Sequence, residues 1–379
     1  MKFIHISDLH LGKRFHETSL IEDQAEILQQ IIALVDTEKP DGVLIAGDVY
    51  DKSMPSAEAV QLFDVFLAEL ATRKMRTFVI SGNHDSPERI AFGGKIMDAS
   101  GIYLSYVYDG SVKTISLTDS HGEVCVYMLP FIKPAHVRRF YADEEISSYT
   151  DAVRVAISKM NVDESKRNVL ITHQFVTGAS RSDSEESVGG TDNVDASVFD
   201  CFEYVALGHL HGAQNCSTER IRYCGTPLKY SFSEANDVKS VTIVELGEKG
   251  SALTVRTTEL KPVRDLRKIK GSFAELTDPA FYNKAGNLND YVQITLTDED
   301  DVPSAMARLQ TIYKNALELK YDNTRTRAAV EDFGAENVEN KSMMELFSEF
   351  FALKNGAEMS DAQKEYMQEL IEKIEEENV

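Results

Sequence analysis

Short, nearly uninterrupted apolar runs alternate with longer segments of helical periodicity over the first two thirds of the chain. Apolar runs of this length that stop at a turn are typical of buried strands. Because ligand sites in open α/β sheets form beyond the carboxyl ends of the strands, the pattern predicts one polar rim. The runs that end in Asp, Asn or His are FIHISDLH (3–10), VLIAGD (43–48), FVISGNHD (78–85), VLITH (169–173) and YVALGHLH (204–211).

The segments between these runs have the spacing of amphipathic helices. Apolar residues share one helical face over 21–35 and again over 56–72. The order strand, helix, strand, helix, strand predicts an α/β fold with a parallel sheet and right-handed crossovers. Short alternating strands are predicted between 102 and 130, and a helix over 147–160. The small, polar and Gly-rich residues 178–198 predict a long loop beside the site.

Changes in sequence character predict three domains. We expect a main domain over 1–260, a small α/β appendage over 261–335 and a helical tail over 336–379. In the small domain the pattern predicts a strand over 291–298 and a helix over 302–319. These boundaries are predictions from composition and periodicity alone.

The tail is expected to be a pair of helices. The first is apolar nearly all round and can be stopped by Asn355-Gly356, while Ser360 and Gln363 form a capping box for the second. Two such short helices can hardly bury this much apolar surface on each other, so we expect a site for a partner protein. Packing of the helices onto the main domain is the alternative.

The charge balance changes the functional expectation. The 379 residues carry a formal net charge of −22. A protein that binds DNA by itself usually presents a basic surface, so this balance argues against a stand-alone nucleic-acid binder. It does not exclude a nuclease subunit whose positive surface comes from bound cations or a partner. The locally basic segment 264–270 offers DNA contacts through Arg264, Arg267, Lys268 and Lys270, with an exposed strand edge as the alternative.

Cysteine usage and the absence of apolar spans indicate the compartment. The chain has four cysteines and no CxxC spacing, so we expect reduced thiols. No basic-then-apolar leader precedes the first strand, and no stretch approaches the roughly 18–20 apolar residues of a membrane span. We therefore expect a cytoplasmic protein.

Oxygen and imidazole donors at the strand ends, with no thiolate, predict a pair of divalent cations. A consistent allocation gives Asp8, His10, Asp48 and His211 to one ion, and Asp48, Asn83, His173 and His209 to the other. The two oxygens of Asp48 can bridge ions about 3.5–4 Å apart that clamp a phosphate. We expect Mn²⁺, with Zn²⁺ and Fe²⁺ as alternatives.

His84 remains after this allocation. It is predicted to act on the leaving oxygen as a general acid, or to contact the transition state, and Asp51 is expected to orient and charge its imidazole. A single histidine after a strand is more often structural. His5, His16, His121 and His136 lack the strand-end context, and we interpret them as ordinary residues.

The motifs DLH, GDVYD, GNHD, THQ and GHLH resemble, in order and spacing, those of the calcineurin-like metallophosphoesterases. The longer forms SDLHLG, SGNHDSPERI and YCGTPLKYSFSE are similar to one branch, the nuclease subunits of bacterial nuclease–ATPase complexes. The resemblance implies a four-layer sandwich, Mn²⁺ dependence, the ligands allocated above and His84 as the catalytic histidine. It also implies that the small α/β domain over 261–335 is a capping domain that contacts DNA, and that the protein is a dimer bound to its ATPase partner.

The activities implied by the resemblance are a double-strand exonuclease and a single-strand and hairpin endonuclease in DNA replication, recombination and repair. One departure is Lys52, where many phosphatases of the class have Arg. This weakens the main alternative, a phosphatase or small-molecule phosphodiesterase on the same scaffold. A scaffold that has lost its metals is a further alternative, which the complete ligand set disfavours.

Overall fold

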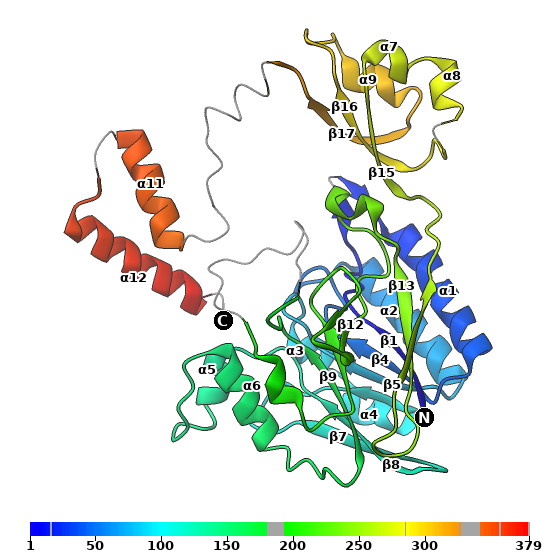
Figure 1. Ribbon diagram of the computed structural model, residues 1–379, viewed down its shortest axis with the longest axis vertical. Helices are drawn as coiled ribbons and strands as arrows, with labels where there is room; N and C mark the ends of the chain where they lie inside the picture. Colours follow the sequence, from blue (N-terminus) through cyan, green and yellow to red (C-terminus); the bar gives the residue numbers. More distant parts are fainter. Residues whose placement is uncertain are drawn as a thin grey trace. The chain divides into compact units, whose positions relative to one another are not determined.

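The computed structural model describes residues 1–15, 17–179, 193–284, 286–324, 326, 342–355 and 358–377 (Figure 1). A first compact unit contains residues 1–185 and 193–321, and a second contains the C-terminal residues from 322 onward. The two are described separately. Most of the loop expected over 178–198 lies outside the described residues.

The first sheet has six strands. Four neighbouring strands, β1, β4, β5 and β6, are parallel to one another. The antiparallel strands β13 and β14 extend the other edge. The order along the sheet is β14 (Thr254–Glu259), β13 (Ser240–Glu245), β1 (Lys2–Ile6), β4 (Gly42–Ala46), β5 (Arg76–Ile80) and β6 (Ile102–Leu104).

The predicted helices cover one face of this sheet (Figure 1). Helix α1 (Ile21–Glu38) buries Ile27, Ile31 and Val35, and α2 (Ala57–Thr72) begins at Ser56, whose side chain accepts a hydrogen bond from Ala59 N. Such a serine cap satisfies an amide that the first helical turn leaves without a partner. Both helices are confirmed.

The second sheet also has six strands. One of its faces packs on the first sheet, and the other packs on helices. Its order is β11 (Gln214–Cys216), β12 (Thr218–Tyr223), β10 (Tyr204–Gly208), β9 (Arg167–His173), β8 (Gly122–Met128) and β7 (Lys113–Asp119). Helices α5 (Pro134–Arg138) and α6 (Tyr149–Ser158) share a core with this sheet. Apolar side chains of both sheets, such as Phe78 and Val126, form the core between them. The four-layer α/β sandwich is therefore confirmed.

Short elements complete the main sandwich. They are β2 (Arg14–Phe15), β3 (Thr18–Ser19), α3 (Pro87–Ile90), α4 (Gly94–Met97) and the 3-10 turns Asp98–Ser100, Ala196–Phe199 and Phe232–Asn236. The four cysteines form no disulfide. No helix in the described parts of the chain is both long and apolar enough to cross a membrane.

A small parallel sheet follows the sandwich. It consists of β15 (Leu266–Gly271), β16 (Tyr291–Leu296) and β17 (Asn315–Tyr321), with α7 (Phe273–Leu276), α8 (Pro279–Tyr282) and α9 (Ala305–Gln310). The helix predicted over 302–319 is wrong in its second half, because α9 ends at Gln310. The following residues instead pair with β16, and tertiary pairing overrides the helical pattern in this short apolar run.

The second unit contains two helices, α11 (Met343–Asn355) and α12 (Asp361–Glu377), which contact each other. The expected capping box is present, since Gln363 N donates to Ser360 Oγ and Ser360 N donates to Gln363 Oε1. Phe350 and Tyr366 remain 54% and 64% exposed. The helix pair thus leaves aromatic surface uncovered among the described residues of this unit.

Candidate metal centre

The predicted ligands come from strand ends of both sheets rather than from a single sheet. Asp8 and His10 follow β1, Asp48 follows β4 and Asn83 follows β5, all in the first sheet; His173 ends β9, and His209 and His211 follow β10, in the second. Because the two sheets face each other across a shared core, the ends of these strands meet at one edge of the sandwich.

Several of these residues have an unusual backbone conformation. The φ angles of Asp8, His10, Asp48 and His209 are 52°, 42°, 47° and 105°. Such left-handed conformations cost roughly 1–3 kcal/mol each for residues with a side chain, and they cluster at functional sites. Main-chain hydrogen bonds of 3.0 Å from Asp8 N to the Gly47 carbonyl and from His10 N to the Asp48 carbonyl hold the two loops together.

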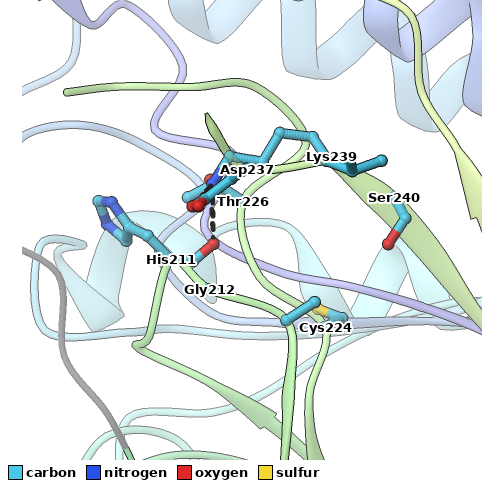
Figure 2. Close-up of a pocket in the computed structure, with 9 residues that line it drawn as sticks. His211, Gly212, Cys224, Thr226, Asp237, Lys239 and Ser240 are labelled. Atoms are coloured by element: carbon cyan, nitrogen blue, oxygen red, sulfur yellow. Dashed lines mark hydrogen bonds and ion pairs between the residues drawn. The ribbon is translucent and has the colours of Figure 1, made fainter. Parts of the chain in front are cut away.

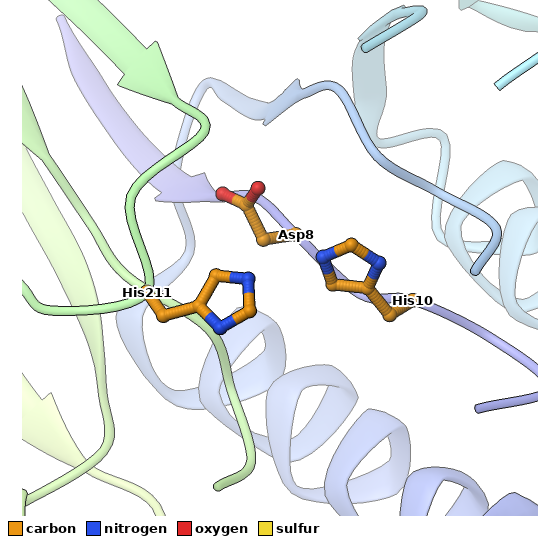
Figure 3. A group of neighbouring side chains, drawn as sticks. All are labelled: Asp8, His10 and His211. Carbon is orange, nitrogen blue, oxygen red and sulfur yellow. The ribbon is translucent and has the colours of Figure 1, made fainter. Parts of the chain in front are cut away.

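Three overlapping groups of donor atoms lie close enough to hold a metal ion. In each group the donor atoms are within 4.8 Å of one another. Figure 3 shows the first group, in which two imidazoles and one carboxylate surround a common space. The groups are Asp8, His10 and His211; His10, Asp48 and His84; and Asp8, Asp48 and His173.

Asn83 joins the same cluster through its amide oxygen. Asn83 Oδ1 lies 2.9 Å from His173 Nε2 and 3.0 Å from His209 Nδ1, and His173 Nε2 lies 3.4 Å from Asp48 Oδ2. All seven residues predicted as ligands therefore meet at one place. Asp8 and Asp48 each belong to two of the three groups, so a carboxylate is placed where it could lie between two neighbouring ions.

His10 provides a direct test of whether the residues fit a metal. Its side chain is 1% exposed, and neither ring nitrogen has a hydrogen-bond partner among the described residues. The nearest carboxylate oxygens, of Asp48 and Asp51, are each 3.8 Å away. Buried polar atoms without partners are rare in folded proteins. The unpartnered nitrogens of His10 therefore indicate that a bound group belongs beside this ring. The residues fit a divalent cation.

The hydrogen bond made by His173 fixes its tautomer. Its Nδ1 lies 2.8 Å from the Ala46 carbonyl oxygen, which can only accept, so Nδ1 carries the proton and donates. Nε2 faces Asn83 and Asp48, and loss of its proton leaves the lone pair on that nitrogen for a metal ion. A carbonyl or carboxylate behind an imidazole is the usual way to orient a metal-binding histidine.

The electrostatics of the cluster are those of a site built for cations. Burial raises the pKa of Asp8 to about 6. Burial would also raise the pKa of Asp48, but His173 and the other imidazoles around it hold that pKa well below its usual range. Burial opposes the charge on His173, yet Asp48 raises its pKa to about 9. The metal-free site thus compensates its carboxylate charge with protons, which cations can replace.

His84 lies at the edge of the cluster, and its contact with Asp51 differs from the expected one. Its Nδ1 donates to the main-chain carbonyl of Asp51 at 3.0 Å, and its Nε2 is 3.9 Å from Asp48 Oδ2. The Asp51 carboxylate instead pairs with Lys13 at 2.8 Å. The expectation that this carboxylate charges the imidazole is corrected, because the turn after β4 presents the carbonyl of residue 51 to the ring.

Two further buried carboxylates in contact with the site were not identified from the sequence. Asp85 is buried and accepts hydrogen bonds from the amides of Val49, Tyr50 and Gly82, which ties the loop after β4 to the loop after β5. Burial and the neighbouring Asp48 raise its pKa to about 7. Asp85 is the final residue of the GNHD motif, which was the sequence feature that could have identified it.

Glu234 is the second missed carboxylate. It is fully buried, and its Oε1 accepts from His211 Nδ1 at 3.2 Å. Burial would raise its pKa, but His211 and Lys239 lower it to about 2. The resemblance motif YCGTPLKYSFSE contained this residue, but no spacing rule connects it with His211.

The four candidate DNA-contact residues differ in their surroundings. Arg264 pairs with Asp23 at 2.7 Å and with Glu22 at 3.3 Å, and Arg267 pairs with Asp290 at 2.6 Å. The two arginines are thus engaged within the chain. Lys268 and Lys270 are exposed on β15.

The remaining histidines behave largely as ordinary residues. His5 is buried between the sheets, with Nδ1 2.9 Å from Tyr204 Oη. Burial and Arg222 lower its pKa to about 3, so it stays neutral. His121 and His136 lie outside the metal groups found among the described residues, and His16 lies outside the described residues.

Comparison with known proteins finds two family models that match the chain. A family model described as calcineurin-like phosphoesterase matches residues 1–213, and a second, described as type 5 capsule protein repressor C-terminal domain, matches residues 262–355. The chain is 31% identical over 379 residues to the SbcD subunit of the nuclease SbcCD of Staphylococcus epidermidis, covering 98% of each chain. It is 34% identical over 327 residues to the protein of the same name from Staphylococcus saprophyticus, covering 84% of each.

Proposed function

This chain belongs to the calcineurin-like phosphoesterase family, and from that premise we propose that it is a metal-dependent DNA nuclease of the SbcD type. The observation that carries the proposal is the convergence of donors from five strand ends around His10, whose buried nitrogens have no hydrogen-bond partner among the described residues. We assign the ligands to two ions, with Asp8, His10, Asp48 and His211 on one and Asp48, Asn83, His173 and His209 on the other.

Two divalent cations at this site, Mn²⁺ by our preference, would neutralise a bound phosphodiester and activate the attacking water. The chain itself supplies orientation. Asp48 lies between the two groups of donors, and the Ala46 carbonyl holds His173 in the tautomer that presents Nε2. Asp85 keeps the Asp48 and Asn83 loops in register through three amide hydrogen bonds.

His84 is the proposed proton donor to the leaving oxygen. Because its Nδ1–H is bonded to the Asp51 carbonyl, Nε2 is the atom that exchanges a proton, and it faces the cluster. The side chain is 43% exposed, so a substrate can reach it. A positioned acid of this kind typically contributes about 10²–10⁴-fold to the rate.

We propose that the substrates are double-stranded ends, hairpins and single strands of DNA, cleaved together with an SbcC-type ATPase. The acidic balance of the chain predicts weak affinity for a polyanion unless a partner or bound cations supply positive surface. The uncovered aromatic surface of α11 and α12, including Phe350, supports a partner site there. Among the basic candidates, exposed Lys268 and Lys270 are the residues we retain for DNA contact.

We further propose that the chain acts as a homodimer in the cytoplasm. Phe92 and Ile96, four residues apart, are 84% and 81% exposed and supply an apolar surface for a second copy. The four free thiols agree with a reducing compartment. Sedimentation of the wild-type chain and of Phe92→Ser with Ile96→Ser tests the dimer.

The function is tested by incubating the chain with Mn²⁺ and either hairpin DNA or a chromogenic phosphodiester, with and without the ATPase partner. We expect cleavage of the hairpin, with His84→Ala as the inactive control. Hydrolysis of the small ester without any cleavage of DNA, even with the partner present, would support the phosphatase or small-molecule phosphodiesterase alternative instead.

A further inference from the structure

His211 is fixed at its main chain by the segment 225–239 (Figure 2). Its carbonyl oxygen accepts hydrogen bonds from Thr226 N at 3.1 Å and from Lys239 Nζ at 3.0 Å. Gly225 has a φ of +75°, and a Cβ at this position would lie 2.7 Å from the same oxygen. Residues 225–239 therefore hold the His211 backbone by close packing as well as by hydrogen bonds.

The imidazole of His211 is held by a different contact. A cavity of about 180 Å³ borders His211, with Cys224, Thr226, Asp237 and Lys239 among its other lining residues. In Figure 2 the ring points away from these residues, and it packs edge-on against His10 and Tyr230, at centroid distances of 5.2 and 6.3 Å. The hydrogen bond from Nδ1 to Glu234 Oε1 adds a directional constraint on the rotation of the ring, which edge-on packing alone does not give.

Glu234 is in turn paired with a buried cation. Its Oε2 lies 2.7 Å from Lys239 Nζ, and the two residues are 0% and 7% exposed. Burying an ion pair costs desolvation energy that a well-packed apolar pair of the same volume would avoid. The pair is therefore poorly explained by stability alone.

We propose that Glu234 is a positioning residue for the metal centre and that Lys239 holds Glu234 in place. A carboxylate only accepts hydrogen bonds, so Nδ1 of His211 carries the proton and Nε2 keeps the lone pair for the ion shared with Asp8 and His10. Loss of such a partner typically lowers metal affinity about 10–100-fold. The inference rests on the proposed binuclear centre.

The test replaces the ion pair without leaving a buried charge unpaired. Glu234→Leu with Lys239→Met removes the acceptor, whereas Glu234→Gln with Lys239→Met keeps an oxygen that Nδ1 can donate to. Asp265→Asn is the matched control, since Asp265 pairs with Lys229 of the same segment at 2.9 Å and is in none of the metal groups. Mn²⁺ binding to each full-length variant is measured by calorimetry without DNA.

For the Leu/Met variant we expect one Mn²⁺ site to weaken about 10–100-fold while the other is retained. The Gln/Met variant should recover most of this loss, and Asp265→Asn should bind both ions as the wild type does. Unchanged affinity at both sites, equal weakening at both, or no recovery with Gln would overturn the proposal. A wild-type chain that binds two ions but cleaves no DNA would instead reject the nuclease function and leave this inference standing.

Discussion

Replacing Gly208 by alanine tests whether close packing between the two sheets positions the ligands. Gly208 ends β10, and a Cβ there would collide with the main-chain carbonyl oxygen of Ala46 and lie 2.7 Å from His173 Nδ1. These two atoms form the hydrogen bond that sets the His173 tautomer. Because the collision is with main chain, no change of rotamer relieves it, and β10 must move away from β4.

Overpacking typically destabilises a fold by about 1–3 kcal/mol. Because the collision is with main chain, we expect Gly208→Ala to lower the free energy of unfolding by about 3 kcal/mol. Gly212→Ala is the matched control in the same GHLHG stretch, since a Cβ there has Gln214 Nε2 at 3.8 Å as its nearest contact. The control should change the free energy of unfolding by less than about 0.5 kcal/mol. The free energies are measured by equilibrium urea unfolding in the presence of a chelator.

The same displacement should weaken metal binding, because His173 and His209 would both move with the ends of their strands. A separate titration of each folded variant with Mn²⁺ distinguishes weaker metal binding from lost stability. Equal unfolding free energies and equal metal affinities for the two alanine variants would refute the argument that this glycine is required by the packing of the site.

His84→Ala should keep both metal ions after dialysis and lower DNA cleavage about 10²–10⁴-fold; loss of the metals would contradict its placement outside the ligand set. Asp48 raises the pKa of His173 to about 9 against the effect of burial, so the metal-free ring is protonated near neutral pH. Metal uptake should therefore release a proton and strengthen as the pH rises toward 9, which calorimetry in buffers of different ionisation enthalpy measures. Deleting residues 341–379 should spare Mn²⁺-dependent cleavage and abolish capture of the ATPase; retained capture in a pull-down would place the partner site elsewhere.

The strand-end donors could be predicted because their position follows from chain direction. An apolar run that stops at Gly47-Asp48 or Gly208-His209 predicts a strand followed by a close turn, and parallel strands bring such turns to one edge. The sequence does not tell which sheet each strand joins. The division of the site between two facing sheets follows only from the tertiary arrangement.

Contacts between residues distant in sequence could not be predicted. The basic segment 264–270 predicted exposed cations, but Arg264 is paired with Asp23, 241 residues earlier in the chain. Glu234 reaches His211 only because residues 225–239 turn back along the His211 loop. The second half of the helix predicted over 302–319 is a strand for the same reason, since its conformation is decided by pairing with β16.

Anomalous scattering from a crystal of the chain with Mn²⁺ tests the binuclear centre most directly. The account predicts two anomalous peaks about 3.5–4 Å apart, with the Asp48 carboxylate between them and His10 and His173 on different ions. A single peak, or two peaks too far apart for one carboxylate to bridge, would contradict it.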